Sequence, residues 1–218
     1  MVGVADQPAP TLPGRKRSEH SRLAILSAAF QLVGELGYGA LTIEGIAARS
    51  GAGKQTIYRW WPSKADVVLD ALATKADLYV PITDLGGLRA DLRAFLTATF
   101  TLGRQEHVVD VLRALMAQAQ LDPEFGQRFR TSFLQRRRDA LGVILARAQV
   151  RGDLPPRLPA STVIDIVFGV LWYRLLASDQ PLDQELVDEL VAVLTNAPSS
   201  EPSTQAPSST VTQRDEPA

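Results

Sequence analysis

The chain has 218 residues, of which 45% are hydrophobic, with a formal net charge of −1, no cysteine and two histidines. This composition fits one large core or two smaller ones, and it excludes a disulfide framework, a thiolate metal site and a cysteine nucleophile. His20 and His107 lie far apart in the sequence, so a histidine-based metal cluster or catalytic triad is not expected, and neither is a cofactor.

The sequence has no pattern typical of export or of membrane insertion. No stretch approaches the ~18 to 20 apolar residues of a membrane span. The first residues lack a charged start followed by an uninterrupted apolar run. We therefore expect a cytoplasmic protein with no membrane partner.

The charges are distributed unevenly along the chain. Residues 1–64 carry eight Lys or Arg against four Asp or Glu, a net charge of +4, whereas the remaining residues carry 15 against 20, a net charge of −5. A basic N-terminal part joined to an acidic remainder is typical of a nucleic-acid reader attached to a second module. Chance segregation of a few charges is the alternative.

The N-terminal part begins with a proline-containing basic segment. We expect residues 1–17, which end in Arg15-Lys16-Arg17, to form a disordered arm. Ser18 is then predicted to cap a helix that ends at Gly37, a residue suited to a left-handed C-terminal position. The apolar stripe of this helix consists of Leu23, Leu26, Phe30 and Val33.

Two short helices and a longer one follow. Thr42 is predicted to cap the first short helix, and Gly51-Ala52-Gly53 to form a tight turn before a second short helix that begins near Lys54. Ser63 and Asp66 have the spacing of a capping box, which predicts a fourth helix from Lys64 to about Tyr79.

The rest of the chain also has helical periodicity, and no segment has the pattern of a strand. The predicted helices span residues 88–102, 108–120, 123–150, 160–177 and 183–194. Residues 197–218 are rich in Pro, Ser and Thr and should form a disordered tail. The predicted fold is all-α, with about nine helices.

The Gly53-Lys54 pair raises the alternative of a nucleotide-binding helical enzyme. A phosphate-binding loop needs Gly-x-x-x-x-Gly-Lys-Ser/Thr after a strand. In this chain Ala48 stands at the first glycine and Gln55 follows the lysine, and the preceding residues have a helical pattern. This alternative is therefore remote, and we do not expect an enzyme.

Two short helices joined by a glycine-containing turn match the layout of a helix-turn-helix DNA-binding unit. An α-helix fits the major groove, and residues at its N-terminus reach the base edges. Lys54, Gln55 and Thr56 would occupy that position, where Lys can contact guanine and Gln can pair with adenine.

The residues from Thr42 to Lys64 resemble the N-terminal domain of the TetR family of bacterial transcriptional regulators. The matching pattern is Thr42-Ile43-x-x-Ile46-Ala47, then Ser50-Gly51-Ala52-Gly53-x-x-Thr56-Ile57-Tyr58-x-x-Trp61-x-Ser63-Lys64, and the resemblance extends from about Ser18 to Leu72. It implies that residues 18–64 form a three-helix DNA-binding domain, which the fourth helix links to a larger helical ligand-binding and dimerisation domain, residues 65–196. It also implies DNA phosphate contacts from Thr42, Tyr58, Arg59, Trp60 and Lys64.

The chain departs from the family pattern at three places in this region. Gly53 replaces the usual Ser or Thr before the reading helix, which removes a side-chain cap. Trp60 replaces the usual His or Tyr, and its indole N–H can serve as a donor to phosphate. Trp61 replaces the usual Phe, and we expect it to be an apolar anchor and the buried member of this aromatic group.

Regulators of this kind bind DNA as pairs, so one surface must contact a second copy. The segment Ala160–Ala177 is apolar almost all round, which indicates burial on more than one side. A central helix in a monomer is the alternative. The predicted homodimer interface consists of Val163, Val167, Val170, Leu171, Leu186, Leu190 and Val193.

The resemblance also implies a pocket for a small-molecule effector in the larger domain. The aromatic residues there have a spacing equally typical of core, and at most one of Arg136, Arg137 and Arg138 is expected to turn inward. The predicted pocket residues are Phe95, Phe100, Met116, Phe129, Phe133, Arg137 and Trp172, with a largely apolar ligand.

The function implied is that of a homodimeric repressor, which binds a palindromic operator in double-stranded DNA and is released by an effector. A ligand-independent or activating DNA-binding regulator is the alternative that the N-terminal motif leaves open.

Overall fold

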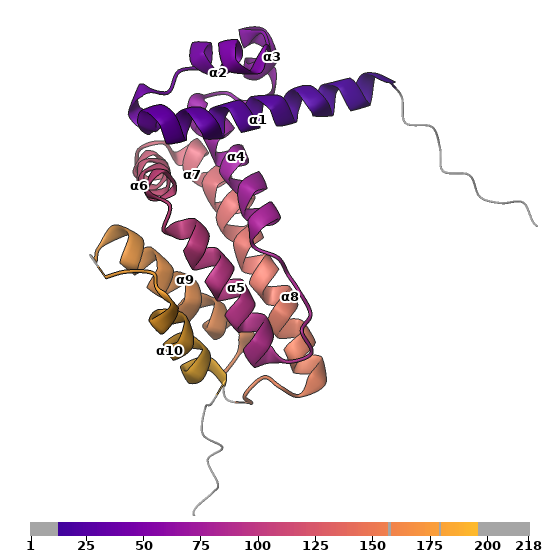
Figure 1. Cartoon of the computed structure of the whole chain (residues 1–218), viewed down its shortest axis with the longest axis vertical. Helices are drawn as coiled ribbons and strands as arrows, with labels where there is room; N and C mark the ends of the chain where they lie inside the picture. The colour runs from indigo at the N-terminus through magenta and orange to yellow at the C-terminus, as the bar shows by residue number, and fades with distance from the viewer. Residues whose placement is uncertain (1–12, 157, 179, 196–218) are drawn as a thin grey trace, which may run out of the picture.

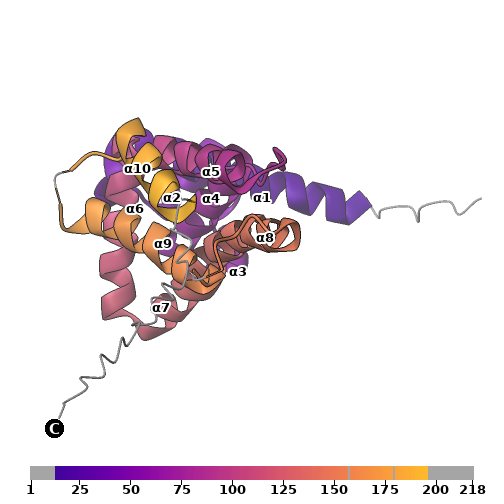
Figure 2. The same ribbon diagram turned by 90° about the horizontal axis from the view of Figure 1, so that it is seen from below.

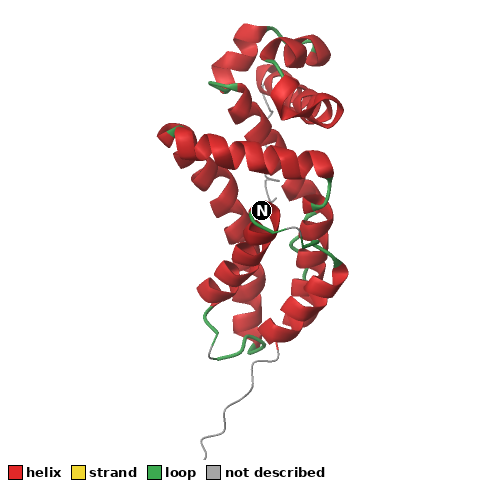
Figure 3. Ribbon diagram, turned by 90° about the vertical axis from the view of Figure 1, so that its left-hand side faces the viewer, coloured by secondary structure: helices red, strands yellow, loops and turns green. Residues whose placement is uncertain are grey.

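We describe a computed structural model of the chain, in which residues 13–156, 158–178 and 180–195 are described (Figure 1). Over these residues the chain forms helices joined by short turns and loops, without a strand (Figure 3), which confirms the all-α prediction. The helices are α1 (Pro13–Ala40), α2 (Ile43–Ser50), α3 (Lys54–Trp60), α4 (Lys64–Tyr79), α5 (Leu88–Gly103), α6 (Glu106–Leu121), α7 (Pro123–Phe129), the π-helical η1 (Arg130–Leu134), α8 (Gln135–Arg151), α9 (Ala160–Leu176) and α10 (Gln184–Thr195).

The first helix is longer than predicted. It begins at Pro13, so Ser18 lies inside it and does not cap it, and residues 13–17 of the expected arm are helical. Residues 1–12 of that arm, and residues 197–218 of the expected tail, lie outside the described residues. Gly37 has a positive φ of 76° and interrupts the helical geometry of α1, as expected of a glycine at this position.

Helices α1, α2 and α3 form a compact head at one end of the molecule, and α4 leads from this head into the body (Figure 1). Helix α1 packs against α2 and α4, and α2 packs against α3. Side chains from each of these helices fill the space between them, among them Ile25, Ile46 and Ile57, which are completely buried. The core of the head is therefore continuous, through α4, with the core of the body.

The body consists of the remaining helices. Helix α5 packs against α8 and α10, and α9 packs against α8 and α6. Helices α9 and α10 lie together at the lower left of the body in Figure 1, and seen from below α9 runs between α10 and α8 (Figure 2). Helix α7, η1 and α8 form one continuous helical run, as the single helix predicted over residues 123–150 implies, but with a π-helical turn inside it.

Helix α6 lies between the head and the body. Its His107 ring packs edge-on against Phe30 of α1, with 5.2 Å between the ring centroids. The same imidazole lies 3.8 Å from the position that a Cβ would take at Gly34. Because α6 also packs against α4, α7 and α9, it contacts both parts of the molecule.

One described helical segment, Ser18–Ala40, is long and apolar enough to cross a membrane by length and composition. In this structure its apolar side packs against α2, α4 and α6. Its Arg22 and Glu35 side chains form ion pairs with Asp70 and Arg49. The segment is thus the central core helix of the head.

Candidate functional sites

The turn between α2 and α3 is built from local interactions that the sequence indicated. Thr42 caps α2, because its Oγ1 accepts a hydrogen bond from the Gly45 amide at 3.0 Å. Gly51 ends α2 in a left-handed conformation, with φ 69° and ψ 11°. Gly53 stands at the N-cap of α3 and provides no side-chain acceptor. The predicted helix-turn-helix geometry is confirmed.

The three predicted base-reading residues lie at the start of α3. Lys54 and Gln55 are exposed, and Thr56 is half-buried. Lys54 Nζ lies 3.1 Å from Glu44 Oε1 of α2. Both side chains are exposed, and an ion pair between solvated groups contributes little to stability, so Lys54 can leave Glu44 at little cost.

The aromatic residues at the end of α3 differ in burial as predicted for the anchor. Trp61 is buried, and its indole Nε1 donates a hydrogen bond to Asp70 Oδ2 at 3.2 Å. Trp60 is half-buried and packs edge-on against Trp61, and the Arg59 guanidinium lies 5.6 Å from the Trp60 ring centroid. Tyr58 is exposed. Tyr58 and Arg59 are thus free to meet a ligand, and Trp61 is a structural anchor.

Lys64 has internal partners that the sequence did not indicate. Its Nζ donates to the carbonyl oxygens of Tyr38, Gly39 and Leu41, at 3.2, 3.3 and 2.9 Å. The ammonium group also lies 4.8 Å from the Tyr38 ring centroid. Since an ammonium group has three N–H donors, these carbonyls occupy all of them. The predicted phosphate contact would therefore have to displace bonds that tie α4 to the end of α1.

Two ion pairs that the sequence did not indicate hold the helix-turn-helix (α2 and α3, the reading unit) against α1 and α4. The Arg49 guanidinium donates two hydrogen bonds to the Glu35 carboxylate, at 2.9 and 2.7 Å, and so fixes α2 on α1. Arg22 donates to Asp70 Oδ2 at 2.7 Å. This is the carboxylate oxygen that Trp61 also contacts, so one aspartate connects α1, α4 and the end of α3. The paired residues are far apart in the sequence, so no local sequence pattern predicts these ion pairs.

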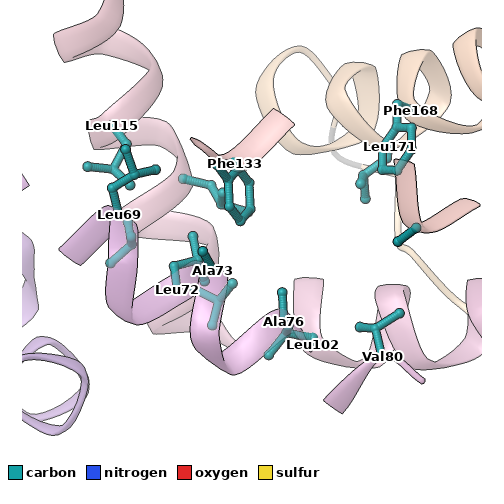
Figure 4. Packing of buried hydrophobic residues seen from close by; sticks show 14 of the residues in the cluster. Leu69, Leu72, Ala73, Ala76, Val80, Leu102, Leu115, Phe133, Phe168 and Leu171 are labelled. Atoms are coloured by element: carbon teal, nitrogen blue, oxygen red, sulfur yellow. The ribbon is translucent and has the colours of Figure 1, made fainter. Parts of the chain in front are cut away.

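The body contains a cavity of about 340 Å³. Its lining is mostly apolar and comes from helices α4, α5, α6, η1, α8 and α9. Figure 4 shows Leu72, Ala76 and Val80 along α4, with Phe133 and the α9 residues Phe168 and Leu171 lying opposite. The remaining residues in contact with the cavity are Thr99, Leu102, Gly103, Val108, Leu112, Leu134, Arg137, Arg138, Asp165, Gly169, Trp172 and Leu175.

The predicted pocket residues are only partly brought together here. Phe133, Arg137 and Trp172 line the cavity. Phe95, Phe100 and Phe129 are core residues with almost no exposed surface, and Met116 packs against that core without reaching the cavity. These four do not line this cavity, because four-residue aromatic spacing is typical of core packing, and only the tertiary arrangement distinguishes core from cavity wall.

Two polar groups in this cavity wall have buried atoms without hydrogen-bond partners. Arg137 is only 6% exposed, and its Nη1 makes one long contact, 3.4 Å, with Asp77 Oδ1. Its Nη2 is buried with no hydrogen-bond partner, and so is the Thr99 hydroxyl. Burial lowers the pKa of the Arg137 guanidinium below its usual range, which means that the charged form is poorly compensated.

The predicted dimer residues do not share one surface. Val163, Val167, Leu171, Leu186 and Leu190 are 0% to 7% exposed in a single chain, so they belong to its own core. Because α9 is apolar all round, periodicity does not show which side faces inward, and the predicted dimer contacts of these five residues stay a prediction. Val170 is half-buried, and Val193 is 66% exposed.

The head thus contains a helix-turn-helix whose second helix presents polar residues at its exposed start, and the body holds a cavity. These features define a DNA-binding regulator with a separate helical domain. Comparison with known proteins agrees. The model "Bacterial regulatory proteins, tetR family" matches residues 25–71, and "Tetracyclin repressor-like, C-terminal domain" matches residues 82–194. The chain belongs to the TetR family, and it is a transcriptional regulator, not an enzyme.

Individual relatives cover nearly the whole described chain. The HTH-type transcriptional regulator YdeS of Bacillus subtilis is 34% identical over 180 residues, 82% of this chain and 89% of YdeS. The DNA-binding transcriptional repressor TetR of Mycobacteroides abscessus is 29% identical, over 82% of this chain and 95% of the relative. The crystal structure of the TetR family regulator SCO0332 superposes with a TM-score of 0.75 at 30% identity, over 81% of this chain and 97% of that one.

Proposed function

We propose that this regulator is a cytoplasmic repressor that binds a palindromic operator as a homodimer and is released when a small molecule occupies the cavity of the body. The observation that carries this proposal is the place of the cavity: two of the helices that line it, α4 and α6, also contact the head. A ligand between these helices can therefore bias the position of α3.

Helix α6 provides the shortest connection between the cavity and the head. Val108 and Leu112 in its first turns line the cavity. The residue before Val108 is His107, which packs against Phe30 and Gly34 of α1. A ligand that moves the start of α6 would move α1 with it. Allosteric release from DNA requires that the ligand bind one arrangement of α6 and α1 more tightly than the other.

Helix α4 provides a second connection between the cavity and the head. Leu72 and Ala76 in its C-terminal half, and Val80 directly after it, line the cavity. Lys64 in its first turn holds the end of α1 through the three carbonyl oxygens described above. Because α4 is one helix, a tilt imposed by a ligand would carry the head with it.

The proposed DNA contacts are those of α3 and its surroundings. Lys54, Gln55 and Thr56 would read base edges, and Thr42, Tyr58, Arg59 and Trp60 would contact phosphates. Thr42 accepts a bond from Gly45 through its oxygen, which leaves its hydroxyl proton for a phosphate. Lys64 would approach the backbone only if its carbonyl bonds were exchanged.

The proposed dimer surface is the outer side of α9 and α10. Ile166, Val170 and Tyr173 follow each other at helical spacing on α9, each half-buried or exposed in the single chain. Val193 on α10 is exposed as well. This side of α9 replaces the predicted Val163, Val167 and Leu171, which face the core.

The proposal is tested with the full chain and DNA from both sides of its own gene. Footprinting should give a protected palindrome, with two chains per site by sedimentation, and transcription from that promoter in vitro should fall when protein is added. Increased transcription would support an activator instead. Operator binding that no candidate compound alters would support the ligand-independent alternative.

A further inference from the structure

Resting on the proposed role of the cavity as the effector site, we propose that its ligand is a monocarboxylic acid with an apolar body, anchored by Arg137. The cavity wall is apolar apart from a few groups, and two of these, Arg137 and Thr99, have buried hydrogen-bonding atoms without partners. Buried polar groups normally have hydrogen-bond partners, so these two atoms are available to a polar group of a ligand.

The charges around the cavity leave an excess at Arg137. Arg136 pairs with Asp77, and Arg138 pairs with Asp165 at 2.8 Å. Arg137 shares Asp77 at 3.4 Å with Arg136, so three arginines stand against two aspartates in this group. Arg137 is the most buried of the three, and apart from its share of Asp77 its guanidinium lies over the Phe95 ring, 5.6 Å from the centroid, so the positive charge without a full carboxylate partner lies at the cavity wall.

A carboxylate fits this site better than a neutral or cationic group. It can accept from the unpartnered Nη2 of Arg137 and cancel the excess charge, and arginine geometry matches the two oxygens of a carboxylate. A cationic ligand would lie against an uncompensated like charge. The Thr99 hydroxyl provides a further donor on α5 to an oxygen of the ligand.

The rest of the ligand should be apolar. Leu72, Ala76, Phe133, Phe168 and Leu171 surround the remaining space, which gives no further charged partner except the Arg138–Asp165 pair. The cavity, at about 340 Å³, lies at the small end of the usual ~300 to 1,000 Å³ of ligand pockets. A fatty acid and an aryl-substituted acid share this chemistry.

The test measures ligand binding to the full chain by calorimetry in the absence of DNA. The probes are decanoate and 4-phenylbutyrate, with decan-1-ol and decylammonium as the neutral and cationic matches of decanoate. Wild type should bind decanoate roughly tenfold or more tightly than decan-1-ol, the gain expected of a charge-assisted hydrogen bond. The tighter of the two acids distinguishes a fatty from an aryl ligand.

The variant Arg137→Met should lose the preference for decanoate over decan-1-ol while it still binds decan-1-ol. The control Arg130→Met removes the same charge from an exposed arginine outside this group of arginines and aspartates and should keep the preference. Arg137→Gln is a second neutral variant should Arg137→Met fail to fold.

Three results would overturn the proposal: equal affinity of wild type for acid and alcohol, an unchanged preference in both Arg137 variants, or no binding of any probe. Acid binding that depends on Arg137 without any change in operator affinity would instead support the site and contradict only the proposed effector release.

Discussion

The Arg128 side chain of α7 and the Asp66 carboxylate in the first turn of α4 form an ion pair, with 2.7 Å between Nε and Oδ1. Asp66 is 5% exposed and also accepts a hydrogen bond from the Ser63 hydroxyl at 2.7 Å. The pair joins residues 62 positions apart. It therefore fixes the start of α4, next to the reading unit, on a helix of the body.

Replacing Arg128 by Gln should destabilise the protein by about 1 to 3 kcal/mol, because the buried Asp66 carboxylate loses its charged partner. Urea unfolding followed by circular dichroism measures this change. Arg130→Gln removes the same charge from an exposed side chain two residues on and should have almost no effect. Equal unfolding midpoints for the two variants would contradict the structural role of the pair.

The sequence predicted the parts of the head that depend on local rules. Thr42 and Ser63 cap α2 and α4, and Gly51 ends α2, as predicted. These features could be predicted because each depends on residues only a few positions apart. The capping box correctly placed Asp66 at the start of α4, but its partner Arg128 could not be identified, since no pattern connects positions so far apart.

The sequence predicted the functional surfaces of the body less well. Phe95 and Phe133 look alike as a pattern, yet one is core and the other lines the cavity. On α9 apolar residues surround the helix, so the sequence pattern did not show which side of the helix faces the core, and Val167, predicted for the dimer surface, is buried within the single chain. Tertiary packing decides both outcomes.

Replacing Lys64 by Met should lower stability by about 1 to 2 kcal/mol, because the carbonyls of Tyr38, Gly39 and Leu41 lose their shared donor while the aliphatic stem is kept. Thermal unfolding measures the change. Tyr58→Phe, by contrast, changes an exposed hydroxyl and should leave stability unaltered while it weakens binding to all DNA sequences. Unaltered stability of Lys64→Met would show that these carbonyl contacts contribute nothing.

Replacing Gln55 by Ala should relax base preference at one position in each half-site, by about 1 to 3 kcal/mol, if Gln55 reads a base edge. The measurement is binding to a set of operators with single base changes. Glu44→Gln is the matched change on α2: it releases Lys54 and removes a negative charge, so it should strengthen binding to every sequence. A uniform loss of affinity in Gln55→Ala would assign Gln55 to the DNA backbone.

Replacing Gly126 by Ala should destabilise the contact between α6 and α7. A Cβ at this position would lie 2.6 Å from the Ala119 carbonyl oxygen, a backbone atom that cannot move alone. Overpacking of this kind costs about 1 to 3 kcal/mol. Gly142→Ala is the control, since its Cβ would lie 4.0 Å from the Ile164 side chain, and there alanine should raise stability through helix propensity. Differential scanning calorimetry of both variants checks the opposite signs.

Replacing Val193 by Arg should convert the proposed dimer to monomers. Val193 is 66% exposed in one chain, so the change should leave the fold of that chain intact, but a second copy covering it would bury an unpaired charge. Val150→Arg makes the same change at a side chain that is 90% exposed at the end of α8, away from the proposed surface. Sedimentation velocity should show the monomer only for Val193→Arg, and operator affinity should fall with it, because a single head contacts one half-site. If both variants sediment alike while operator binding persists, the two copies must meet on a different surface from the outer side of α9 and α10.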